Sequence, residues 1–222
     1  MPVRYNGPMT TAPPGSQSNA LLALLAFAAL SAGLLFAVWK TEQRPDVPGL
    51  LWPDPPQIGA FSLIGSDGQP YTEAQLRGHW TFLFFGFAQC PDVCPGTLAV
   101  LKQVKAKLEG DPAFGADGQV LFVSIDPERD TPATLGPYVQ YFDPTFKAAT
   151  GPEEALTALT RPLGVIYARV PGGGADYSMD HTASIFLIDP QLRVLSAISL
   201  PHEAQAIADR FRAIAAFVAQ LP

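Results

Sequence analysis

The only two cysteines in this 222-residue chain, Cys90 and Cys94, lie four positions apart, and a proline follows each of them. Two thiols held this close can form a disulfide bond, exchange a disulfide with another protein, or bind a soft metal ion. A disulfide across so short a loop would add little stability, because it restricts few conformations of the unfolded chain. The pair therefore points to redox or metal chemistry rather than to a structural cross-link.

The residues around the cysteines predict their place in the fold. The apolar run from Trp80 to Phe87 is typical of a strand buried on both faces, and Pro95 to Leu108 carries a helical apolar stripe. Because Pro95 lacks an N–H, the helix is expected to begin there, with Cys94 at its N-cap. The helix dipole would then favour the thiolate of Cys94 and lower its pKa. We therefore expect a reactive dithiol at the carboxyl end of a strand, where α/β folds place functional sites.

A metal ion would need more ligands, and the chain has three histidines. His79 precedes the buried strand, at the end opposite the cysteines, and His202 adjoins the start of the last predicted helix. His181 lies in a polar loop, Tyr177 to Thr182, that leads into a predicted strand. Taken alone, a histidine in a loop is more often structural than a metal ligand, so the residues by themselves leave the role of His181 open.

The donor types narrow the choice of metal. Two thiolates and an imidazole are an incomplete set for structural zinc, which usually takes four protein ligands. They suit copper better, since thiolate favours Cu(I). Met179 is a candidate fourth soft ligand, but we expect it not to bind. An open coordination position would suit transfer of the metal rather than its storage.

A long apolar segment precedes the folded part of the chain. Residues Ala20 to Trp39 are all apolar or small, and twenty helical residues span roughly 30 Å, the thickness of the hydrocarbon core of a bilayer. A cleaved signal peptide is the alternative, but no strongly basic segment precedes the run, and Leu30-Ser31-Ala32 is a poor cleavage site. We expect an uncleaved single-span anchor. The flanking positive charges do not fix its orientation, and the lack of an Arg-rich presequence favours a bacterial cytoplasmic membrane.

Composition predicts four parts: a disordered tail at 1–19, a transmembrane anchor at 20–39, a Pro-rich linker at 40–57, and one folded domain at 58–222. The net charge of −6 argues against nucleic acid as a partner. Within the domain, strands and helices alternate and then a strand pair precedes a last helix, which predicts an α/β fold around a mixed sheet. The expected elements are a hairpin at 60–68, strands at 80–87, 120–125, 165–170, 184–188 and 194–199, and helices at 95–108, 132–142 (capped by Thr131), 152–161 and 203–219.

Several stretches, in consistent order, resemble the Sco/SenC family of copper chaperones, which act in cytochrome c oxidase assembly. The matching stretches are Phe85-Gly86-Phe87, the Cys90 to Pro95 motif, Val123 to Pro132, Tyr141-Phe142-Asp143, Thr150-Gly151 and Asp180 to Ser184. The resemblance implies a thioredoxin-like domain behind an N-terminal anchor, with the N-terminus in the cytoplasm and the domain in the periplasm. Two details depart from the family: Phe87 and Ala88-Gln89 replace a Tyr-Thr-His type sequence, and the Gly172–Gly174 loop looks shorter and more flexible than expected.

The resemblance also implies a role for each site residue. Cys90, Cys94 and His181 would bind one copper ion, as Cu(I) or Cu(II), and Asp180 would either orient the imidazole or be a solvated acid. The implied task is to accept copper from a periplasmic donor and deliver it to the dinuclear copper centre of cytochrome c oxidase subunit II. Such a metallochaperone would have no turnover of its own.

An enzymatic alternative uses the same cysteines. A membrane-tethered thiol-disulfide oxidoreductase would reduce the cysteines of that copper centre or of another exported protein. General oxidoreductases of the thioredoxin type have two residues between their cysteines and a cis-proline in the facing loop. This chain has three intervening residues, and its facing loop holds His181. A peroxiredoxin-type peroxidase is disfavoured, because Phe87 and Pro91 stand where its threonine would be. Copper delivery and thiol reduction are not exclusive, since oxidation of the pair would abolish copper binding.

Overall fold

The computed structural model describes residue 7 and residues 16–42, 47–115, 117–170 and 177–221. The chain divides into two units, residues 1–46 and residues 47–222, which are described separately. Residues 43–46 of the linker predicted at 40–57, most of the predicted tail, and the Gly172–Gly174 loop lie outside the described residues.

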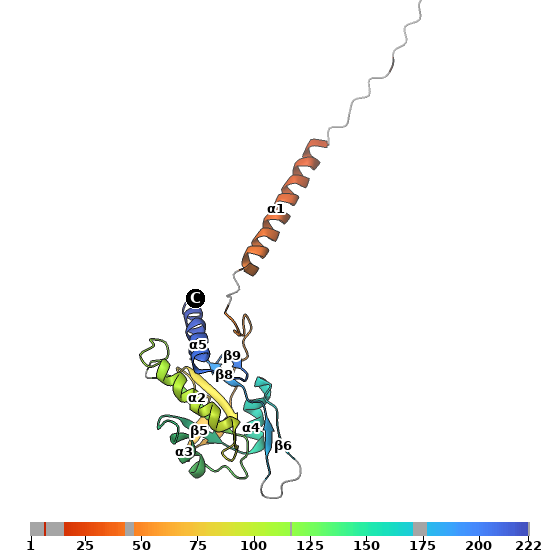
Figure 1. Ribbon diagram of the computed structural model, residues 1–222. Helices are drawn as coiled ribbons and strands as arrows, with labels where there is room; N and C mark the ends of the chain where they lie inside the picture. The colour runs from red at the N-terminus through yellow and green to blue at the C-terminus, as the bar shows by residue number, and fades with distance from the viewer. Residues whose placement is uncertain (1–6, 8–15, 43–46, 116, 171–176, 222) are drawn as a thin grey trace, which may run out of the picture. The chain divides into compact units, whose positions relative to one another are not determined.

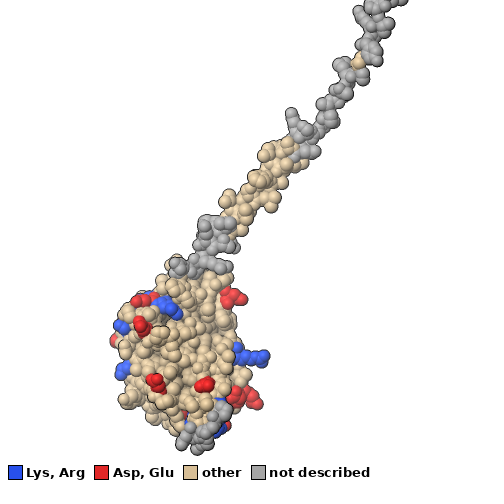
Figure 2. All heavy atoms as spheres, turned by 45° about the vertical axis from the view of Figure 1, so that its right-hand side comes forward, with Lys and Arg blue, Asp and Glu red and all other residues tan. Residues whose placement is uncertain are grey.

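The described residues of the first unit include the helix α1 (Ser16–Glu42), which is rich in alanine and leucine, two of the strongest helix formers. Its stretch Ala20–Ala37 is long and apolar enough to cross a membrane, and none of that stretch is buried. Figure 2 shows it free of Lys, Arg, Asp and Glu. The helix extends past both ends of the predicted span, so the part of the predicted tail at 16–19 is helical.

The second unit is built on a seven-stranded mixed sheet in the order β2-β1-β5-β4-β3-β8-β9. Figure 1 shows this unit, with β5, β8 and β9 of the sheet labelled. Strands β3, β4 and β5 are mutually parallel, and the other neighbouring pairs are antiparallel. The mixed sheet was predicted; β5 was not, because its two central alanines give no clear apolar alternation. The strands are β1 (Ser62–Gly65), β2 (Pro70–Thr72), β3 (Thr81–Gly86), β4 (Gln119–Ser124), β5 (Lys147–Thr150), β8 (Ile185–Ile188) and β9 (Val194–Ile198).

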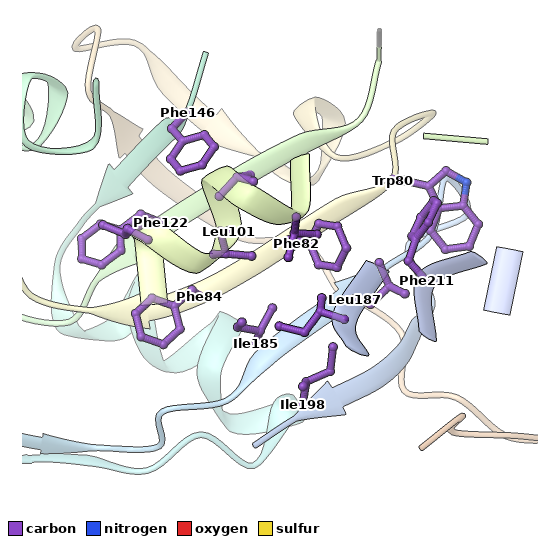
Figure 3. Close-up of a cluster of buried hydrophobic side chains, with 14 of the residues drawn as sticks. Trp80, Phe82, Phe84, Leu101, Phe122, Phe146, Ile185, Leu187, Ile198 and Phe211 are labelled. Carbon is purple, nitrogen blue, oxygen red and sulfur yellow. The ribbon is translucent and has the colours of Figure 1, made fainter. Parts of the chain in front are cut away.

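Helices cover both faces of this sheet. Side chains of α2, α3 and α5 pack in one hydrophobic cluster, shown in Figure 3, and those of α4 pack in the other. The Thr131 cap predicted for α3 is present, with its hydroxyl accepting from the Thr134 amide at 3.3 Å. The helices are α2 (Val93–Lys107), α3 (Pro132–Gln140), α4 (Glu153–Thr160) and α5 (Ala204–Val218), with 3-10 turns η1 (Glu73–Gln75) and η2 (Arg161–Leu163).

Strand β3 lies inside the sheet and is buried on both faces, as its continuous apolar sequence predicted. Phe82 and Phe84 point into the cluster under α2 and α5, and Leu83 and Phe85 point into the opposite cluster. Its neighbour β8 runs antiparallel to it, so β8 begins at the edge of the sheet where β3 ends. The chain after β3 and the chain before β8 therefore meet at one edge.

A separate two-stranded ribbon leads to the start of β8. It consists of β6 (Tyr167–Arg169) and β7 (Met179–His181), with Tyr167 opposite His181. The strand predicted at 165–170 is thus shorter and pairs outside the main sheet. The loop predicted around His181 is also wrong: His181 ends a strand, because residues some fourteen positions earlier supply the backbone partners that a local sequence pattern does not reveal.

The second unit begins at Val47, earlier than the boundary predicted at residue 58. The Leu51 amide donates to the Leu195 carbonyl at 2.8 Å, and the Trp52 ring packs edge-on against Phe217 at a centroid distance of 5.1 Å. Residues 47–57 are therefore part of the folded unit rather than a spacer, and their prolines shape a segment that packs against β9 and α5.

Candidate metal centre

The cysteine loop joins β3 to α2 at the carboxyl edge of the sheet, as predicted. However, α2 begins at Val93 with Asp92 as N-cap, so Cys94 lies within the first turn and is not the cap. Pro95 occupies the third helical position, whose N–H would have no partner within the helix, so a proline is tolerated there without marking the helix start. The Cys94 amide instead donates to Cys90 Sγ at 3.4 Å.

Cys94 is completely buried, whereas Cys90 is half-buried, and both are free thiols. Gly86, the last residue of β3, makes room for the buried sulfur. A Cβ at this position would lie 2.7 Å from Cys94 Sγ and 2.9 Å from Phe122 Cε2. Only glycine allows strand and sulfur to approach this closely.

Burial raises the pKa of the Cys94 thiol and is the largest effect. A backbone hydrogen bond to Phe87 lowers the pKa, and the neighbouring Cys90 raises it. The lowered pKa predicted from the helix dipole is therefore wrong for this structure. Desolvation of the thiolate is more unfavourable than its interaction with the dipole of the helix N-terminus is favourable. Cys94 is a protonated thiol at neutral pH until something replaces its proton.

His181 lies directly over this thiol. Its Nε2 is 3.7 Å from Cys94 Sγ, and its Nδ1 is 3.0 Å from the Thr182 carbonyl oxygen. A carbonyl only accepts, so we assign the proton to Nδ1, which leaves the lone pair of Nε2 facing the sulfur. Phe84 and Phe87 pack edge-on against the ring, each at a centroid distance of 6.1 Å.

The protonation state of His181 also suits a ligand. Burial lowers its pKa, opposed by the hydrogen bond to Thr182 and by the charge of Asp180. A neutral imidazole is the form that binds metal. Fixing the ring through its other nitrogen is the arrangement that metal-binding histidines usually show.

The distance between the two donors fits a shared ion. With metal–sulfur and metal–nitrogen bonds of about 2.3 and 2.05 Å, tetrahedral to trigonal angles separate the donors by about 3.6–3.8 Å. Cys94 Sγ and His181 Nε2 are 3.7 Å apart. Cys90 is beside them, but no three His, Cys, Asp or Glu side chains among the described residues already form a group that could hold a metal ion. Cys90 Sγ would have to turn from the Cys94 amide to complete the set.

The neighbours of His181 on β7 have other surroundings. Asp180 is exposed, and the Nδ1 proton goes to Thr182, so Asp180 is not the acceptor that orients the ring. Met179 is half-buried and packs against both hydrophobic clusters. Its packing helps to fix the position of β7, and it is not placed as a metal ligand.

The remaining histidines are structural. His202 accepts from the Thr97 hydroxyl at Nδ1 (3.1 Å) and donates from Nε2 to the Ile198 carbonyl (3.1 Å), which occupies both ring nitrogens and ties α2 to the end of β9. His79 Nδ1 donates to the Asp117 carbonyl at 2.9 Å, at the opposite end of β3. Of the three histidines, His181 is the one brought to the cysteines.

The turn between β4 and α3, for which the sequence predicted no role, also contacts the cysteine loop. Asp130 is almost fully buried, and its Oδ2 accepts from the Ala88 amide at 2.8 Å and from the Ser124 hydroxyl at 2.5 Å. The available signal was the stretch Asp126 to Asp130, with three acids and one arginine directly after a buried strand, where polar side chains need partners.

Comparison with known proteins agrees with this geometry. The SCO1/SenC family model matches residues 53–216. The protein SCO2 homolog, mitochondrial, of Mus musculus is 35% identical over 94% of this chain and 83% of its own length, and the Bos taurus homolog is 38% identical over 69% of this chain and 58% of its own.

Solved structures give the same result. Arabidopsis thaliana ScoI with copper bound is 32% identical, with a TM-score of 0.66 over 73% of this chain and 98% of that one. Bradyrhizobium japonicum ScoI with copper bound is 35% identical, with a TM-score of 0.62 over 69% and 97%. The α/β domain thus has the thioredoxin-like architecture of the Sco structures, with the cysteine pair after a parallel strand and His181 before the antiparallel one. This chain belongs to the SCO1/SenC family.

Proposed function

We propose that this protein is a copper metallochaperone that binds one copper ion through Cys90, Cys94 and His181 and delivers it to the dinuclear copper centre of cytochrome c oxidase subunit II. The observation that carries the proposal is the 3.7 Å separation of Cys94 Sγ and His181 Nε2, with the Nε2 lone pair directed at the sulfur. Two relatives were solved with copper bound, which supports the choice of metal.

The three proposed ligands differ in burial, and we assign them different roles in binding and releasing the ion. His181 is held neutral and oriented, and Cys94 is completely buried in the hydrophobic cluster that also contains Phe84 and Phe122. Half-buried Cys90 is the ligand within reach of a partner. Transfer is then an exchange of ligands. A ligating side chain of the protein that receives the copper replaces Cys90 first, and the oxidation state of the copper does not change.

We further propose that α1 anchors the protein in a bacterial cytoplasmic membrane, with the N-terminus in the cytoplasm and the domain in the periplasm. The apolar stretch Ala20–Ala37 supports the anchor. The orientation follows from the proposed task, because a periplasmic copper donor and the copper centre of the oxidase would meet the domain on that side.

Thiol-disulfide exchange is the second candidate function. The free thiols of Cys90 and Cys94 support it, because they lie four residues apart with one accessible to a partner. In that reaction Cys90 would attack the partner disulfide, and Cys94 would release the partner as a reduced thiol while the pair becomes oxidised. The raised pKa of Cys94 disfavours a fast second step, because the attacking species is the thiolate.

An anaerobic copper titration of the reduced full-length chain in detergent tests the proposal. We expect one copper per chain, and a large loss of affinity in His181→Ala but not in His79→Ala, a histidine remote from the cysteines. Equal affinity of His181→Ala and the parent chain would contradict the three-ligand site. Turnover of a disulfide substrate without stoichiometric copper binding would favour the oxidoreductase.

A further inference from the structure

We infer that Arg129 is a positioning residue that fixes β7, and with it His181, against the cysteine loop. The inference rests on the proposed function, since it concerns the placement of a proposed ligand. Arg129 belongs to the turn Asp126–Asp130, which follows β4 at the same edge of the sheet as the cysteines.

Arg129 holds the residue that enters β7. Its Nη1 donates to the Tyr177 carbonyl at 2.7 Å, and its guanidinium lies over the Tyr177 ring at 3.7 Å from the centroid. Its Nε donates to Asp126 Oδ2 at 2.5 Å, in an ion pair whose side chains are 13% and 3% exposed. The Arg129 side chain thus contacts both the backbone and the ring of Tyr177, which lies two residues before β7 begins at Met179.

Tyr177 is fixed from its other sides as well. Its hydroxyl donates to Asp126 Oδ1 in a short hydrogen bond, and Arg169 of β6 stacks on its ring at 3.6 Å. The Tyr177 ring therefore lies against two guanidinium groups, and Asp126 joins its hydroxyl to the Arg129 side chain. Tyr177 can leave this position only if all of these contacts break together.

The same turn holds the cysteine loop. Asp130 accepts from the amide of Ala88, two residues before Cys90, and the Arg129 guanidinium lies 5.7 Å from the Phe87 ring centroid. Neighbouring residues of one short turn therefore contact both segments that carry the proposed ligands. His181 and Cys94 are 87 positions apart in sequence, and this turn is a rigid link between them.

A purely structural ion pair explains these contacts less well. The Arg129 Nη2 is buried and has no hydrogen-bond partner among the described residues, which is costly for a charged group. A buried pair is often no more stabilising than apolar residues of similar volume, and its best attested use is to specify one arrangement. The arrangement specified here is the approach of β7 to the cysteines.

A double-mutant cycle on the full-length chain in detergent tests the inference, with copper affinity measured by chelator competition. We expect Arg129→Gln to weaken copper binding by about 10-fold in the parent chain, the lower end of what outer contacts of a metal site contribute. In the His181→Ala background the same substitution should change affinity by less than about twofold, because the group that it positions is gone.

Arg193→Gln is the matched control. Arg193 forms a similarly buried ion pair with Asp189 at 2.6 Å, in the β8–β9 turn at the opposite end of the sheet. We expect it to lower stability without changing copper affinity. Tyr177→Phe keeps both guanidinium contacts and loses only the bond to Asp126, so it supplies a milder variant if Arg129→Gln does not fold.

A readout without copper separates this inference from the proposed function. In the reduced apo protein, ¹⁵N NMR should show the His181 ring mainly protonated at Nδ1, with Arg129→Gln but not Arg193→Gln giving mixed tautomers. Equal loss of copper affinity with and without His181, or an unchanged ring in Arg129→Gln, overturns the inference. Failure of the parent chain to bind copper counts against the proposed function alone, because the NMR comparison still tests Arg129.

Discussion

Cys94 and His181 face each other in protonation states that exclude an ion pair. Burial raises the pKa of the thiol and lowers the pKa of the imidazole, so the apo site holds a neutral S–H against a neutral nitrogen lone pair. Each group avoids an unpaired buried charge. A cation entering between them would supply the charge that makes the thiolate favourable, which couples metal uptake to loss of a proton.

The first prediction concerns this coupling. Because Cys94 is protonated at neutral pH, copper binding at pH 7 should release at least one proton per ion, and affinity should rise by about tenfold per pH unit for each proton released. Isothermal titration in buffers of different ionisation enthalpy measures the proton count. An affinity independent of pH between 6 and 8 would show that Cys94 is not a ligand.

A second residue-scale prediction concerns Gly86→Ala. The new Cβ would lie 2.7 Å from Cys94 Sγ, in a strand packed on both faces, so we expect a loss of about 1–3 kcal/mol in stability and weaker copper binding. Urea unfolding and copper titration measure the two effects. Gly96→Ala should instead be neutral or stabilising, because Gly96 lies in the first turns of α2 and its new Cβ would meet no atom within 4 Å beyond its chain neighbours and the backbone of its own helix.

At the scale of elements, the site is formed where four segments converge on one edge of the sheet. The loop after β3 brings the cysteines, the ribbon before β8 brings His181, and the turn after β4 contacts both. His202, in the loop after β9, ties the end of that strand to α2 one turn beyond Cys94. The proposed ligands are thus held by connections whose ends are fixed by strand pairing.

This arrangement predicts a pH-dependent effect of His202. Burial lowers its pKa, so the folded state binds fewer protons than the unfolded state, and stability falls as pH drops below about 6.5 toward the folded pKa. His202→Ala should lower the free energy of unfolding by about 1–3 kcal/mol at pH 8, because Thr97 and Ile198 lose their hydrogen-bond partner. Between pH 7 and 5 the stability of this variant should fall less steeply than that of the parent chain.

Urea unfolding at several pH values checks this prediction, with His79→Ala as the control histidine at the other end of β3. If stability falls as steeply with decreasing pH in His202→Ala as in the parent chain, groups other than His202 cause the loss. His181 would be one of them, since burial lowers its pKa too.

At the scale of the whole molecule, the chain combines an apolar helix with a domain that has its own two hydrophobic clusters. The segment from Val47 belongs to that domain, since Leu50 packs against the core and the Leu51 amide pairs with β9. Residues 47–57 are therefore part of the domain, although the sequence predicted a spacer there.

This division predicts different outcomes for two truncations. A chain starting at Val47 should unfold cooperatively with the stability of the full domain. A chain starting at Ile58 should be less stable by about 3 kcal/mol or more, because it exposes apolar surface now covered by Leu50 and Trp52. Thermal and urea unfolding compare them, and equal stabilities would mean that residues 47–57 are a spacer after all.

Local pattern was enough to predict much of this molecule. The apolar run of β3, the helical stripe of α2 and the Thr131 cap each depend on neighbours within a few residues, and the structure confirms them. The last helix, predicted at 203–219, is present as α5. The mixed α/β order follows from the succession of these elements. The cysteine spacing by itself limited the chemistry to redox or soft metal.

The tertiary structure decided what depends on distant residues. Strand β7 exists because β6 pairs with it, and the distance from His181 to Cys94 is set by the β3–β8 pairing and the Asp126–Asp130 turn. The protonation of Cys94 follows from its complete burial beside Gly86, which outweighs the effect of the helix dipole predicted from the sequence. Sequence fixes which groups are present, whereas desolvation and the approach of strands far apart in the chain determine which groups meet and in what charge state.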